Sequence, residues 1–124
     1  MRAVIARVLT GTALGVVIAT SAIAAPAAKL SPTDIQTTFF NGQPFTASTL
    51  SNVKYKMTFL ADGKMKREPI GSGHKGEGTW KLSKDGFCTT WGGATMANCF
   101  TLVNAGANKW SVIKGSTIQA VWTK

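Results

Sequence analysis

The sequence has few of the side chains from which metal sites and hydrolytic sites are built. It contains one histidine, His74, and two cysteines, Cys88 and Cys99. A zinc site needs at least three protein ligands, so these residues do not provide one. The five carboxylates are scattered along the chain, whereas glycoside hydrolysis uses a closely placed pair. We therefore expect no metal, no cofactor and no catalytic residue, and we predict that the protein is not an enzyme.

The sequence also lacks an uninterrupted apolar run long enough to span a membrane. The N-terminal stretch has basic residues at Arg2 and Arg7, then an apolar run with small polar interruptions, then Ala22-Ile23-Ala24. This order is typical of a secretory signal peptide. The wholly apolar stretches are shorter than the ~20 residues of a membrane span, although a membrane anchor is the alternative. We predict a signal peptide over residues 1–24, cleaved after Ala24, and hence a periplasmic or secreted protein.

Acidic residues and arginine are scarce in the rest of the chain. Leaving out Arg2 and Arg7, the 14 basic residues become 12, against five acidic ones, which gives a net charge of +7. Lysine attracts anions as a point charge, without the planar geometry of arginine. The excess therefore predicts affinity for an anionic envelope polymer, without specific recognition of nucleic acid. A charge that only confers solubility is the alternative. The candidate anion-binding residues are Lys54, Lys56, Lys64, Lys66 and Arg67.

Helical periodicity is confined to one short segment before Pro44. Ser31 can serve as N-cap, Pro32 suits the first turn, and Asp34 lies near the positive helix end. Asn41-Gly42 offers a left-handed stop. We predict one short helix there, preceded by a flexible arm over residues 25–30. About 100 residues suffice for one core but not for two, so residues 31–124 are predicted to form a single domain.

The remaining sequence predicts short strands separated by turns. Apolar and polar residues alternate over residues 53–59, and Asp62-Gly63 is a turn signal. No segment long enough for a crossover helix separates the strands, which favours an antiparallel up-and-down meander. We predict an all-β fold with one short N-terminal helix and seven or eight strands, forming a small barrel or a flattened sandwich. The further strands are expected at residues 64–67, 78–82, 87–91, 98–103, 109–113 and 117–122.

The two cysteines lie in neighbouring predicted strands. In an exported protein a lone pair of cysteines most simply forms one disulfide. If the two strands form a hairpin, Cys88 and Cys99 can face each other within bridging distance. We predict a Cys88–Cys99 disulfide, with two reduced, buried thiols as the alternative.

A glycine-rich segment, GSGHKG at residues 71–76, contains a G-x-G-x-x-G match. A dinucleotide-binding loop needs a helix directly after the glycines, but residues 78–82 are strand-like. Glycine also suits an ordinary connection between strands, which is our prediction here. The alternative is a small periplasmic hydrolase-type enzyme that uses His74 and Glu77 as an acid–base pair, although no motif ties a nucleophile to them.

Aromatic residues are the most informative feature present. In a small barrel, inward aromatic side chains either fill the interior or line a ligand cup. Trp91 is expected at the rim because it borders Gly92-Gly93. We predict a monomeric binding or interaction module that engages an anionic envelope component or a small apolar ligand; a purely structural envelope protein is the alternative. The candidate ligand-binding residues are Trp80, Trp91, Trp110, Trp122 and Tyr55.

A family resemblance follows from Gly78-x-Trp80, the run Asp85-Gly86-Phe87-Cys88, Trp91 and Cys99. This pattern resembles a group of small exported bacterial domains of unknown function. More loosely it is similar to calycin-type barrels, the lipocalin and avidin class, whose first strand often carries a G-x-W. The resemblance implies a β-barrel over residues 53–122. Here the Gly78-x-Trp80 motif follows earlier strands instead of opening the barrel, so no ligand residue of that class is carried over.

Overall fold

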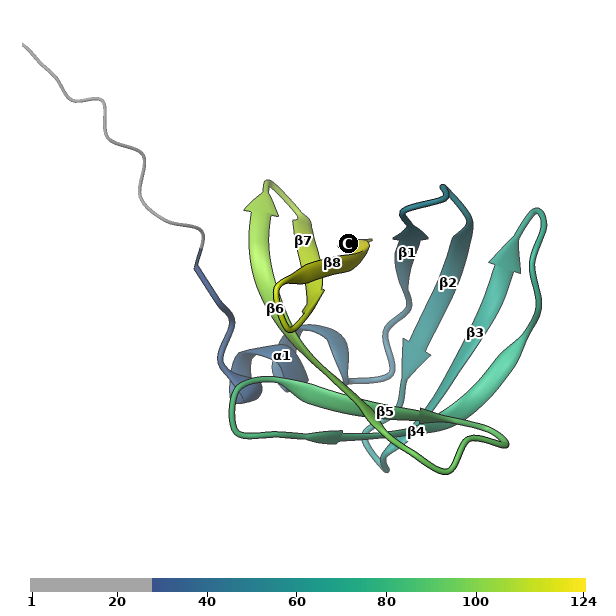
Figure 1. Cartoon of the computed structure of the whole chain (residues 1–124), viewed down its shortest axis with the longest axis horizontal. Helices are drawn as coiled ribbons and strands as arrows, with labels where there is room; N and C mark the ends of the chain where they lie inside the picture. The colour runs from purple at the N-terminus through teal and green to yellow at the C-terminus, as the bar shows by residue number, and fades with distance from the viewer. Residues whose placement is uncertain (1–27) are drawn as a thin grey trace, which may run out of the picture.

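A computed structural model of the chain describes residues 28–124. The predicted signal peptide, residues 1–24, lies outside the described residues. Eight antiparallel strands form a closed barrel in which each strand pairs with the next along the chain and β8 pairs with β1 (Figure 1). The strands are β1 (Phe45–Thr49), β2 (Lys54–Phe59), β3 (Lys64–Ile70), β4 (Gly76–Leu82), β5 (Phe87–Trp91), β6 (Asn98–Gly106), β7 (Lys109–Lys114) and β8 (Thr117–Thr123).

The predicted fold class is confirmed, and the choice between barrel and sandwich is settled as a barrel. The sequence indicated seven of the strands but gave no explicit range for β1. In β1, Phe45 and Ala47 are buried while Thr46 and Ser48 are only partly so. With only two apolar positions, one of them alanine, this strand carries too weak an alternation to be recognised.

Helix α1 (Pro32–Phe39) begins and ends as its sequence predicts. The backbone N–H of Asp34 donates to Ser31 Oγ at 3.1 Å, which satisfies one of the free donors of the first turn. Gly42 has a φ of +85°, a conformation that glycine adopts without steric cost. The chain can therefore turn sharply from α1 into β1.

Two aromatic side chains close one end of the barrel: Phe39, the last residue of α1, and Phe40, its C-cap, which together are called the aromatic plug. The ring of Phe40 stacks on that of Phe59 at 4.4 Å and lies 4.5 Å from that of Trp80. The ring of Phe39 meets that of Trp110 edge-on at 4.9 Å. Such pairs add to the stabilisation from buried area. The end of the barrel at α1 is therefore filled by side chains.

The Cys88–Cys99 disulfide is confirmed. Cys88 and Cys99 are direct partners in the register of β5 and β6, which pair at three positions. Phe87 and Thr89, on either side of Cys88, line the interior of the barrel, so the bridge lies on the outer face of the sheet. The disulfide therefore links β5 and β6 covalently at the positions where they pair.

The described part of the N-terminal arm runs beside β6. The backbone N–H of Leu30 donates to the Leu102 carbonyl at 2.8 Å, and that of Asn104 donates to the Ala28 carbonyl at 2.9 Å. Lys29 lies 3.8 Å from the Asp85 carboxylate. Residues 28–30 thus pair with β6 through an antiparallel bridge between Lys29 and Val103, beyond the last pair of β6 with β5. Across residues 28–124, no helix has the length and apolar character to cross a membrane.

Candidate functional site

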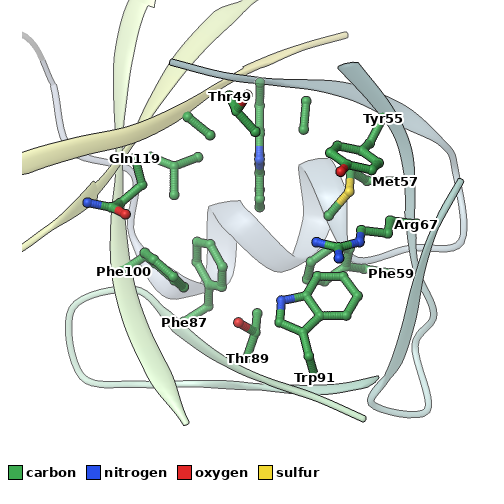
Figure 2. A pocket seen from close by; sticks show the side chains of 14 residues that line it. Thr49, Tyr55, Met57, Phe59, Arg67, Phe87, Thr89, Trp91, Phe100 and Gln119 are labelled. Carbon is green, nitrogen blue, oxygen red and sulfur yellow. The ribbon is translucent and has the colours of Figure 1, made fainter. Parts of the chain in front are cut away.

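A cavity of about 150 Å³ lies inside the barrel, between the aromatic plug and the opposite end. Its base is formed by Phe59, Phe87 and Trp122, whose rings also contact that of Phe40 or one another. Ala47 and Ala120 are inward positions with short side chains. Because these two residues do not reach across the barrel, the interior beyond the plug stays partly unfilled. Figure 2 looks into this space, with α1 behind it.

Arg67 points into the cavity from β3. Side chains alternate across a strand, and Met65 on the same face is buried while Lys64 and Lys66 are exposed. Among the described residues that line the cavity, Arg67 is the one charged side chain. The prediction that Arg67 belongs with the exposed lysines was wrong, because the run is basic throughout and hides the change of face. Inward and outward positions alternate along this segment, with Met65 inward. This alternation is the signal that would have distinguished Arg67 from the outward lysines.

Two aromatic rings hold the Arg67 guanidinium. Its central carbon lies 4.9 Å from the centre of the Tyr55 ring and 4.7 Å from that of Trp91. Figure 2 shows the guanidinium between these two side chains, with Phe100 and Gln119 across the cavity. Arginine interacts favourably with aromatic faces through the ring quadrupole. The Arg67 side chain is therefore held in one position.

Gly76 makes room for this arrangement. A Cβ atom at Gly76 would lie 3.0 Å from Arg67 Nε and 3.4 Å from two atoms of the Trp91 ring. Gly76 is the direct partner of Arg67 in the register of β3 and β4. A side chain here would press on Arg67 and touch Trp91, so glycine at this point leaves room for the two residues to lie together.

The Arg67 guanidinium has no counter-ion within the described residues. Its Nε is buried and without a hydrogen-bond partner. All five carboxylates of the sequence fall in residues 28–124, and the two ion pairs formed there join Lys29 with Asp85 and Lys56 with Glu68. The buried Nε is left without an acceptor, which is unfavourable, whereas the Arg67 side chain as a whole is only half-buried. Arg67 thus presents an uncompensated positive charge to an otherwise uncharged cavity.

The structure separates the candidate ligand-binding residues into two groups. Tyr55, Trp91 and Trp122 line the cavity. Trp80 and Trp110 do not line it, because their rings pack against Phe40 and Phe39 of the plug. The indole N–H of Trp80 donates to the Leu60 carbonyl at 2.8 Å, which satisfies its one donor.

The candidate anion-binding residues are also divided. Lys54, Lys56, Lys64 and Lys66 are exposed on the outer face of β2 and β3, whereas Arg67 lies inside. Lys56 forms an ion pair with Glu68 at 3.4 Å, and Lys66 is paired in register with Glu77. The two glutamates reduce the positive charge of this face.

His74 and Glu77 are both exposed and belong to the β3–β4 connection and the start of β4. Neither residue lines the cavity. Gly71 and Gly73 in this connection have φ values of +92° and +129°, a region that favours glycine. A Cβ at Gly73 would lie 3.0 Å from Tyr55 Oη. The glycines thus let the connection turn tightly beside the Tyr55 wall of the cavity.

Four large apolar side chains of residues 28–124 are exposed, and all lie at the end of the barrel away from α1. The residues that contact the plug lie at the start of β1, β5 and β7 and at the end of β2 and β8. The opposite ends of these strands and their connections therefore form the open end. The four residues there are Leu50, Ile70, Met96 and Ile118.

No group of three metal-ligating side chains comes together in residues 28–124. Comparison of the chain with protein-family models, with curated proteins and with solved structures found no match. The resemblance to calycin-type barrels therefore stays a prediction.

Proposed function

We propose that this protein is a non-enzymatic binding module that takes a small, largely apolar ligand into its barrel. The observation that carries the proposal is the cavity of about 150 Å³ between Trp122 at its base and the open end. Ligand sites are typically concave and mostly apolar, with a few polar groups that set orientation. Phe87, Phe100 and Val112 supply the apolar lining, and Arg67 supplies a polar group.

The size of the cavity limits the ligand. An apolar protein cavity of about 150 Å³ is large enough to bind benzene. A single ring or a short alkyl chain therefore fits within the barrel, and a larger ligand has to extend out of the open end. The exposed side chains Leu50, Ile70, Met96 and Ile118 at that end give such an extension apolar surface to contact.

The proposal includes export to the periplasm or the outside of the cell. Disulfides persist in oxidising compartments and are rare in the cytosol, and Cys88 and Cys99 are joined. An anionic polymer bound by the lysine face is supported less well, because Glu68 and Glu77 lie among those lysines. Surface charges spaced in this way contribute weakly and are screened by salt.

Titration of the purified protein with toluene, followed by two-dimensional amide NMR, tests the proposal. We expect saturable shifts for residues around the cavity, among them Trp91, Phe100 and Ala120. The variant Ala120→Phe places a ring in the cavity and is expected to lose these shifts, because the space for the ligand is filled.

Val121→Phe is the matched control, since Val121 is the next residue of β8, is absent from the cavity lining and pairs with Ser48 and Ser111. We expect this variant to bind toluene as the parent protein does. The absence of saturable shifts in the parent protein, or equal shifts in Ala120→Phe, would show that the cavity is not a ligand site.

A further inference from the structure

We propose that the ligand carries a single anionic head group, a carboxylate, that pairs with Arg67 while a small apolar body fills the rest of the cavity. This inference rests on the proposed function and adds the chemical class of the ligand. It depends on three properties of Arg67: its uncompensated charge, its fixed orientation, and the kind of surface that faces it.

The charge of Arg67 calls for a partner. Its Nε is buried with no hydrogen bond, and no carboxylate of the described residues lies within ion-pair distance of it. A buried donor without an acceptor is unfavourable, and more so when the group is charged. The terminal nitrogens of the guanidinium are not among the buried atoms, so an anion in the cavity can reach them and supply the missing charge.

The orientation of Arg67 suits a carboxylate. Tyr55 and Trp91 lie against the guanidinium, so the N–H donors in its plane remain available for hydrogen bonds. Guanidinium donors are arranged as a planar fork that matches the two oxygens of a carboxylate. The two rings also fix the side chain before the ligand arrives, which reduces the entropy lost on binding.

The surface opposite Arg67 suits an apolar body. Figure 2 shows Phe87 and Phe100 across the cavity from Arg67, and Val112 and Ala120 also line the space. One guanidinium matches one monovalent head group, and about 150 Å³ accommodates one ring. Benzoate and hexanoate are therefore suitable probes, whereas a cation of the same shape would be repelled.

Calorimetric titration with matched pairs of probes tests the inference at low ionic strength. Benzoate is compared with benzamide, and hexanoate with hexanamide, because each pair differs mainly in charge. We expect the parent protein to bind each acid at least tenfold more tightly than its amide, as charge-assisted hydrogen bonds are roughly twice as strong as neutral ones.

Two variants of neighbouring residues locate the charge that is responsible. Arg67→Met removes the cation but keeps a long side chain, and we expect it to lose the preference for the acids while still binding the amides. Lys66→Met removes the same charge from the adjacent, outward position of β3, and we expect the preference to remain. Arg67→Met should fold, since the lost contacts with Tyr55 and Trp91 are offset by removal of an unpaired buried donor.

A measurement on the unmodified protein makes the test independent of how the variant folds. Arg67 is the only arginine in residues 28–124, so its Nε–H signal in NMR can be assigned by comparison with Arg67→Lys. We expect benzoate to shift this signal at saturation and benzamide to shift it far less.

The outcomes separate the two levels of the proposal. Equal affinities for the acids and amides, or an acid preference that persists in Arg67→Met, would overturn the anionic ligand and leave the binding module standing. An unshifted Arg67 Nε–H at benzoate saturation would do the same. If neither the probe pairs nor toluene binds the parent protein, the proposed function itself fails.

Discussion

Replacement of Phe40 by alanine is expected to destabilise the protein by about 3–5 kcal/mol, the usual cost of removing a buried phenylalanine ring. Phe40 is 1% exposed, and its ring contacts those of Phe59, Trp80 and Phe87. These residues come from three different strands, so the substitution removes packing contacts at the place where α1 joins the barrel. Since small domains are stable by only about 5–15 kcal/mol, urea denaturation should show a much lower midpoint.

Gln36→Ala is the matched control for this prediction. Gln36 is an exposed residue of the same helix, and its replacement is expected to change stability by less than about 0.5 kcal/mol. A Phe40→Ala protein as stable as Gln36→Ala would show that α1 does not plug the barrel. The base of the proposed ligand site would then be incorrectly assigned.

Removal of the disulfide is expected to have the next largest effect. Cys88 and Cys99 are separated by 11 residues, and closing a loop of that length contributes about 3 kcal/mol in the chain-entropy model. Cys88→Ala/Cys99→Ala should therefore unfold at lower urea concentration than the parent. Because β5 carries Phe87, Thr89 and Trp91 and β6 carries Phe100, toluene binding should weaken as well.

Comparison with and without a reducing agent provides the control for the disulfide. The parent protein should lose stability on reduction by about as much as the double variant does, and the double variant should be indifferent to the reductant. Two reactive thiols in the untreated parent protein, or equal urea midpoints for parent and variant, would contradict the account.

The fold could be predicted largely because its signals are local. The alternation in residues 53–59, the turn at Asp62-Gly63 and the cap at Ser31 each act within a few residues, and the structure bears them out. The strand expected at residues 64–67 extends to Ile70 in the structure and so includes a proline, Pro69. This proline pairs with Tyr55 of β2, beyond the last pair with β4. Proline is tolerated there because one side of the strand needs no further hydrogen bond from it.

The site was harder to predict because it depends on contacts between distant residues. Tyr55, Arg67, Gly76 and Trp91 come from four consecutive strands, and the pairing of β2, β3, β4 and β5 brings them together. The basic composition around Arg67 pointed to a surface, since charged residues are usually exposed. A sequence also does not show whether inward aromatic residues fill a barrel completely. Here the side chains of Ala47 and Ala120 are short, and a cavity therefore remains.

A crystal structure of the protein with 4-bromobenzoate tests the central claim most directly. The anomalous signal of bromine identifies the position of the ring without any assumption about the surrounding side chains. The account predicts one bromine site inside the barrel near Phe100 and Val112, with the carboxylate oxygens within hydrogen-bond distance of Arg67. A barrel interior closed by side chains, or bromine found only outside it with Arg67 paired to a carboxylate of the chain, would contradict it.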